Sequence, residues 1–187
     1  MQVDLQHPDT PPPPADPSAS SAGAPAMGEQ APLITVCHST SIHAVHRLWS
    51  SSLSEKANAE RYGAALGVHG HVYEFRVEFR GPVCKKTGQI MGTDLLEDVI
   101  SLALTEVLSH KHLDSDISFF LSRPSTLENV CLFAWRNISV IMAPHPFDLV
   151  EVSVEAEPCP RNEHSRALKR SRVSFKGEMV NVPSESC

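Results

Sequence analysis

Residues 67–81 read GVHGHVYEFRVEFRG, and their alternation predicts a β-strand. Apolar side chains stand at the odd positions, namely Tyr73, Phe75, Val77 and Phe79. Because successive side chains of a strand point to opposite faces, these residues form one row that faces the core. His69 and His71 continue the row at its head, so the two imidazoles lie side by side.

The imidazole row needs polar partners, because a buried ring nitrogen without one is costly. A shared metal ion would satisfy both rings, and hydrogen bonds to backbone carbonyls are the alternative. Residues 33–46 place their apolar side chains mainly at even positions, which predicts a second strand ending in His46 with the same facing. Three histidines would leave the fourth position of a tetrahedral Zn²⁺ open, as in catalytic sites.

The remaining periodicities predict two helices and two further strands after a loop with a short helical stretch. One helix is predicted from Asp94 to Val107 with Glu97 as its capping-box partner, and another over residues 125–138. Strands are predicted over 147–157 and 172–178. The order ββααββ indicates an α+β fold, an antiparallel four-stranded sheet with two helices on one face. Its two open edges favour self-association.

Length and composition indicate one folded domain with an acidic balance. The 187 residues, 41% of them hydrophobic, suit one core, which we place at residues 32–180. Residues 1–31, rich in Pro, Ser and Ala, predict a disordered tail, and 181–187 a second tail. A basic loop insertion, 157–171, is either a solvated loop or a surface that attracts an anionic ligand.

The sequence argues against several classes of protein. The net charge of −6 argues against a nucleic-acid partner. The sequence lacks an apolar run of about 18 residues, which argues against a membrane span. Five cysteines without CxxC spacing, and the lack of a signal or arginine-rich presequence pattern, predict a reduced, cytoplasmic protein.

Six sequence blocks then resemble the 6-pyruvoyl-tetrahydropterin synthase and 6-carboxytetrahydropterin synthase family, in the family's order. They are HAVHRLWSSSLSEKANAERYG (43–63), HGHVYEFRVEFRG (69–81), TGQIMGTDLLEDV (87–99), LSHKHLDSD (108–116), STLENVCLFAW (125–135) and VSFKGE (173–178). The resemblance covers about residues 33–180 and implies the ββααββ tunnelling fold (T-fold). It also implies a homo-oligomer, a trimer or a hexamer of two trimers, in which sheets close into a barrel and active sites lie at subunit interfaces.

The resemblance assigns roles to particular residues. It implies that His46, His69 and His71 bind Zn²⁺ and that the substrate is a reduced pterin, 7,8-dihydroneopterin triphosphate, which loses triphosphate to give 6-pyruvoyl-tetrahydropterin. Glu128 would hold the pterin ring, with Thr126 in the same segment. The spacing alone predicts instead that Ser125 and Glu128 form a capping box, and the two interpretations are compatible.

Three positions depart from the family pattern. Ala65 stands where the family has its general base, a cysteine, and Ser109 replaces the aspartate beside the catalytic histidine, which is kept as His110. Ala156 replaces a second pterin-binding glutamate, and Glu155 falls on the opposite face by parity. The sequence therefore leaves three functions open: an active lyase of tetrahydrobiopterin biosynthesis, a catalytically silent protein that binds zinc and pterin, and a 6-carboxytetrahydropterin synthase-like enzyme, whose loop before HGH this chain matches in length.

Overall fold

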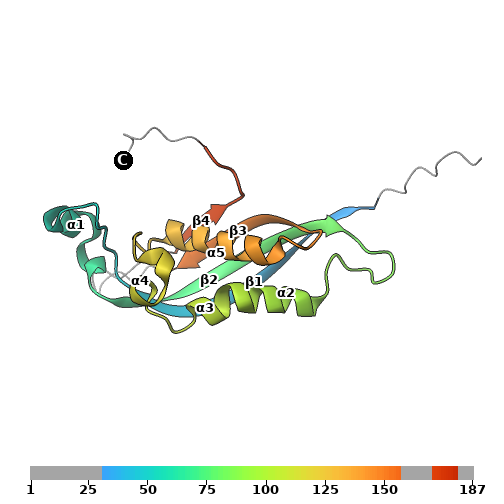
Figure 1. Ribbon diagram of the computed structural model, residues 1–187, viewed down its shortest axis with the longest axis horizontal. Coiled ribbons are helices and arrows are strands. Elements are labelled where there is room, and N and C mark those ends of the chain that lie inside the picture. The colour runs from blue at the N-terminus through green and yellow to red at the C-terminus, as the bar shows by residue number, and fades with distance from the viewer. Residues whose placement is uncertain (1–30, 157–169, 181–187) are drawn as a thin grey trace, which may run out of the picture. The chain divides into compact units, whose positions relative to one another are not determined.

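The computed structural model describes residues 31–156 and 170–180. Residues 1–30 of the predicted N-terminal tail, most of the predicted basic loop and the predicted C-terminal tail lie outside these residues. The described part contains one antiparallel sheet whose strands follow the order β1–β2–β3–β4 (Figure 1). The strands are β1 (Leu33–His46), β2 (His69–Pro82), β3 (Asp148–Ala156) and β4 (Ser171–Phe175).

The longer helices pack against one face of this sheet, and shorter ones lie in the connections. The helices are α1 (Glu55–Tyr62), α2 (Thr93–Ile100), α3 (Glu106–Leu108), α4 (Leu113–Asp116) and α5 (Leu127–Met142), with a π-helical turn (Ser101–Thr105) and 3₁₀ turns at Gly63–Leu66 and Ser118–Phe120. Figure 1 shows α2 and α5 lying along the strands, in the same general direction. The predicted α+β class and four-stranded antiparallel sheet are confirmed.

The core lies between the sheet and these helices, on the face that the alternation predicts. Phe75, Val77 and Phe79 of β2 are at most 1% exposed, and Ile42 and Ala44 of β1 are also buried. They pack with apolar residues of α2 and α5 in one cluster. Burial of such side chains contributes about 1.5–3 kcal/mol each, so this face fixes which residues of β1 and β2 point inward.

The helix starts differ from the predicted capping boxes. Helix α2 begins at Thr93 after Gly92, and no side chain caps it, so the predicted Asp94 capping box is wrong. Helix α5 begins after Thr126, whose hydroxyl accepts a hydrogen bond from the Asn129 backbone N–H at 3.4 Å. The prediction that Ser125 forms this cap is also wrong, because its hydroxyl binds elsewhere, as described below.

The predicted first helix is continuous but irregular. Residues 101–105 form a π-helical turn between α2 and α3. The Asn137 side-chain amide, on α5, donates a hydrogen bond to the Ala103 carbonyl at 3.1 Å. A carbonyl loosened from the regular helix pattern thus gains a partner on the neighbouring helix. Among the described helices, none combines the length and the apolar character needed to cross a bilayer.

Candidate metal centre and its cavity

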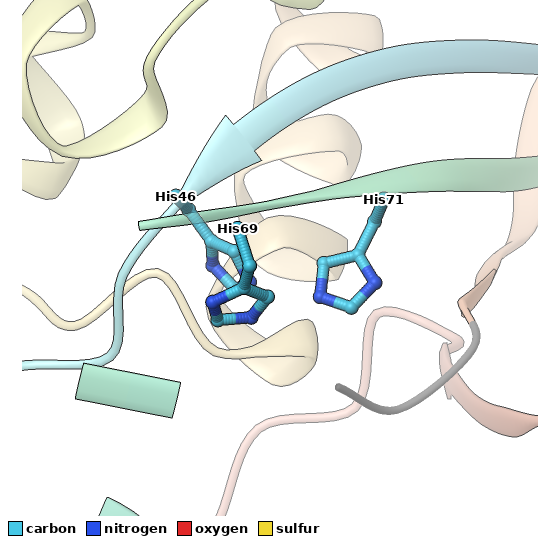
Figure 2. Close-up of side chains that lie close together, drawn as sticks. All are labelled: His46, His69 and His71. Carbon is cyan, nitrogen blue, oxygen red and sulfur yellow. The ribbon is translucent and has the colours of Figure 1, made fainter. Parts of the chain in front are cut away.

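The register of β1 and β2 brings three histidines together. His46 lies directly opposite His69, and His71 follows two residues along β2 on the same face. Opposed residues of an antiparallel pair have Cβ atoms about 4.5–5.5 Å apart, within reach for two imidazoles. The ring centroids are 4.6 Å (His46–His69), 5.0 Å (His46–His71) and 4.9 Å (His69–His71) apart. Figure 2 shows the three rings entering the same space below the strands.

Backbone carbonyls fix the tautomers of two of these rings. The His46 Nδ1–H donates to the Ser125 carbonyl at 2.9 Å, and the His69 Nδ1–H donates to the Gly67 carbonyl at 2.7 Å. Since a carbonyl only accepts, each ring keeps its lone pair on Nε2. The His46 Nε2 is buried and has no hydrogen-bond partner among the described residues. This orphaned lone pair is what a metal ligand requires.

The donor set fits a zinc ion. One ligand nitrogen from each histidine lies within 4.8 Å of the other two. Burial, followed by the neighbouring His69 and His71 rings, lowers the pKa of His46 to about 4, so this ring is neutral near pH 7. Neutral imidazoles are preferred ligands of zinc, and three of them leave an open position.

A second layer of hydrogen bonds supports His46. The Ser125 hydroxyl lies 3.0 Å from the His46 Nδ1 and donates to an Asp114 carboxylate oxygen at 2.7 Å. The other Asp114 oxygen accepts the Arg47 backbone N–H at 2.8 Å. Ser125 is completely buried, whereas Asp114 is half-buried, so the bond between His46 and Ser125 is the part that is shielded from water. Sequence reasoning missed both supporting residues, because the spacing of Ser125 and Glu128 also fitted a helix cap.

A cavity of about 360 Å³ opens beside the three histidines, and we call it the histidine cavity. Three parts of the chain build its walls. The strands contribute the histidines, Tyr73, Ala156, Ser171 and Val173; the start of α5 contributes Thr126, Leu127 and Glu128; and the segment through α1 contributes Leu48, Arg61, Tyr62, Ala64 and Ala65. The predicted metal ligands and the predicted pterin-binding residues therefore share one cavity.

Buried Asn58 holds the α1 wall in place. Its side-chain oxygen accepts the Ser50 N–H at 2.8 Å, and its amide donates to the carbonyls of Ser50, Leu53 and Ser54 at 2.9–3.1 Å. The Leu48 N–H donates to the Ala65 carbonyl at 2.8 Å. These bonds tie the loop after β1 to the turn that contains Ala65.

Two of the positions that depart from the family pattern lie on the walls of the histidine cavity. Ala65 and Ala156 both line it, so neither wall offers an ionisable group at these places. Glu155 lines a different cavity and pairs with Arg172 at 2.7 Å and with Arg170 at 3.7 Å. The parity prediction for Glu155 is consistent with this placement.

His110 lies outside the histidine cavity. It lines a larger cavity of about 690 Å³, with His43, Glu74 and Glu155 among its walls, that meets the histidine cavity at His71 and Ala156. The His110 backbone N–H donates to the His43 carbonyl at 2.6 Å, beside the edge of β1. Its φ of +59° lies in the left-handed region that residues other than glycine seldom adopt. Within one chain, the predicted catalytic histidine therefore shares the larger cavity with His71 but does not line the histidine cavity.

Comparisons with known proteins agree with this architecture. Residues 35–164 match the family model described as 6-pyruvoyl tetrahydropterin synthase. The chain belongs to this family. The 6-pyruvoyl tetrahydrobiopterin synthase of Drosophila melanogaster is 34% identical to it over 131 residues, 69% of this chain and 77% of that protein. The human protein of that name is 34% identical over 104 residues, 54% of this chain and 72% of the human one.

A solved structure supports the family fold. The 6-pyruvoyl tetrahydropterin synthase of Caenorhabditis elegans superposes with a TM-score of 0.67 at 30% identity, covering 80% of this chain and 99% of that one. The resemblance that the six sequence blocks indicated is thus confirmed for the 6-pyruvoyl tetrahydropterin synthase family.

Proposed function

We propose that this protein is a zinc-dependent lyase of the 6-pyruvoyl tetrahydropterin synthase type that acts on 7,8-dihydroneopterin triphosphate. One observation carries the proposal: three imidazoles from adjacent strands face a cavity that also contains Glu128 and Thr126. The cavity volume of about 360 Å³ falls in the range of small-molecule sites. Named relatives that are synthases of this type support the lyase class.

Each wall then has a chemical role. His46, His69 and His71 would hold Zn²⁺, which supplies Lewis-acid polarisation of side-chain hydroxyls and makes protons on neighbouring carbons more acidic. The Glu128 carboxylate accepts hydrogen bonds from the amino and imino groups of the pterin ring. Loss of a side-chain proton and cleavage of the carbon–oxygen bond to triphosphate complete the elimination.

We further propose a homo-oligomer, a trimer or a hexamer, in which a neighbouring subunit supplies the acid–base residue. His110 is exposed and lines the larger cavity rather than the histidine cavity of its own chain, which favours a copy from another subunit beside the metal. In the described residues, no strand pairs with the outer edge of β1, which contacts only the segment around His110 to His112 near its end, through hydrogen bonds of His43 and Val45 and a bridge between Val45 and His112. Such an open edge is suited to pairing with another chain.

A second candidate is a catalytically silent protein that binds zinc and a pterin. Ala65 and Ala156 favour it, because they remove ionisable groups from the cavity walls while the three histidines and Glu128 remain. A 6-carboxytetrahydropterin synthase-like activity is the third candidate, and the short turn between Ala65 and His69 is the feature that favours it.

One set of measurements separates these functions. Purified protein is assayed for bound zinc by elemental analysis, then for triphosphate release and pterin products from 7,8-dihydroneopterin triphosphate. His71→Ala should lose the zinc, whereas His43→Ala should keep it, because His43 is on the same strand as His46 and faces the other side. Zinc-dependent turnover supports the lyase, and zinc and pterin binding without turnover supports the silent protein. A zinc-free preparation that does not bind added zinc would contradict both the lyase and the silent binding protein.

A further inference from the structure

The hydroxyl of Tyr73 is a buried polar atom that the proposed metal site leaves without a partner. In the described part of the chain, the His46 Nε2 and the Tyr73 hydroxyl are both buried at the histidine cavity without a hydrogen-bond partner. A metal ion accounts for the nitrogen. Since buried tyrosine hydroxyls are normally hydrogen-bonded, the oxygen needs its own explanation.

Tyr73 stands next to the histidines in the same row of β2. The residue is 3% exposed, and its ring centroid lies 5.5 Å from that of His71 and 6.1 Å from that of His46. It lines the histidine cavity, on the side of the metal ligands. A ligand group that contacts the three histidines in this cavity therefore lies near the Tyr73 ring.

Packing gives no reason for a hydroxyl at this position. Phe75 continues the row two residues later, is 1% exposed and contacts the Tyr73 ring at a centroid distance of 6.4 Å. At the next inward-facing position of β2, a phenylalanine packs in the same core without a hydroxyl. An unpaired hydroxyl in such a place costs free energy unless a bound molecule pairs with it.

We propose that the Tyr73 hydroxyl donates a hydrogen bond to an oxygen on the side chain of the bound pterin, where that side chain lies against the three histidines. The inference rests on the proposed function and adds a specificity-determining residue to it. A pterin with an oxygenated side chain supplies the missing acceptor. A pterin with a plain methyl group leaves the buried hydroxyl unpaired, so Tyr73 discriminates between the two.

The test compares two probes on the full-length, zinc-loaded protein. 7,8-Dihydroneopterin carries side-chain hydroxyls, and 6-methyl-7,8-dihydropterin has the same ring without them. Tyr73→Phe should weaken binding of dihydroneopterin by about threefold to tenfold, the worth of one hydrogen bond, and leave binding of the methyl compound unchanged. Tyr62→Phe, which removes the other tyrosine hydroxyl of the chain from the same cavity, is the matched control and should not change the ratio.

The other outcomes overturn the inference. Equal affinities in wild type and Tyr73→Phe would show that the hydroxyl makes no ligand contact, and equal losses for both probes would indicate a packing role. Loss of zinc from Tyr73→Phe would make Tyr73 a metal ligand, and the same selective loss in Tyr62→Phe would remove the specificity from Tyr73. If wild-type protein binds neither probe, the proposed function fails and the inference fails with it.

Discussion

The parts of the histidine cavity wall differ in which of the expected functional groups they contain. The strand side holds three imidazoles, supported by Ser125 and Asp114, in the arrangement that a zinc ion needs. Elsewhere on its walls, Ala65 in the turn after α1 and Ala156 at the end of β3 occupy positions where the resemblance places a cysteine and a glutamate. In the proposed site, the three histidines and Glu128 are present, whereas alanines occupy the two positions where the resemblance implies a proton-transfer group and a second ring contact.

The comparison teaches that the proposed metal ligands and the proposed position of the general base come from separate elements of this fold. The three histidines belong to β1 and β2, whereas Ala65 lies in the turn after α1 and Ala156 ends β3. A substitution at Ala65 therefore changes no residue of the strands that carry the histidines. Substitutions in each part of the cavity wall test these proposed roles separately.

The largest effect is expected from adding a thiol at position 65, where the resemblance places the family's general base. Ala65→Cys places a thiol on the wall of the histidine cavity, and a positioned general base is typically worth about 10²- to 10⁴-fold in rate. We expect triphosphate release to rise by about a hundredfold or more. The rate is measured by phosphate assay on zinc-loaded protein.

Ala64→Cys is the control for this prediction, since it adds a thiol one residue away. If both variants release triphosphate equally faster than wild type, the position of the thiol does not matter, and Ala65 does not mark the place of a general base. If wild type already turns over as fast as Ala65→Cys, another group supplies the base and the contrast between the two sides disappears.

Low pH should lower the free energy of unfolding of the metal-free protein, because His46 on β1 becomes protonated. His46 has a pKa of about 4 in the fold, against about 6.5 in an unfolded chain. Because the unfolded state takes up the proton first, the stability contributed by neutral His46 is present above pH 6.5 and is lost as the pH falls towards 4. The expected loss is about 3 kcal/mol of unfolding free energy.

Urea unfolding of chelator-treated protein at pH 7 and pH 4.5 measures this loss. His46→Gln removes the titrating group, so its unfolding free energy should change less over the same range. Parallel pH dependence in the two proteins would contradict the assignment.

Ser125→Ala should weaken zinc binding by about tenfold to a hundredfold, the usual cost of losing a partner behind a metal ligand. The substitution removes the hydroxyl between His46 and Asp114, but it leaves the Ser125 carbonyl in place. Competition with a chelator gives the zinc affinity. Ser122→Ala, an exposed serine three residues earlier, is the control, and equal affinities in the two variants would show that the hydroxyl is dispensable.

The smallest effect is expected at the ring contact that remains. Glu128→Gln should weaken binding of a reduced pterin by about tenfold, because a neutral amide replaces a charged acceptor at an exposed position. Fluorescence titration with 7,8-dihydroneopterin measures the change. Glu155→Gln, which lies in the other cavity, should bind as wild type does, and a matching loss there would point to general charge rather than contact.

Local periodicity predicted the parts of the fold that depend on alternation. The rows of β1 and β2 and the shared facing of His46, His69 and His71 follow from parity alone, and the register of the two strands completes the cluster. The contact between His46 and Ser125 joins residues 79 positions apart. Neighbouring residues hold no signal of that contact, so the same serine was interpreted as a helix cap.

Other features of the site were beyond sequence reasoning for similar reasons. Alternation predicts Tyr73 as a core residue, but only the structure shows that its hydroxyl lacks a partner among the described residues. His110 is close in sequence to Asp114, yet a left-handed backbone turn directs it to another cavity. Sequence predicts which face a side chain occupies better than it predicts which polar groups meet there.

The buried Asn58 gives the wall that contains Ala65 a foundation of its own. Four hydrogen bonds from one amide set the course of that loop without help from any side chain that enters the cavity. Residues at the cavity surface are therefore free to vary at little cost to folding. Over generations, single replacements at these positions add or remove reactive groups while the loop keeps its course, and the same property makes position 65 suited to engineering.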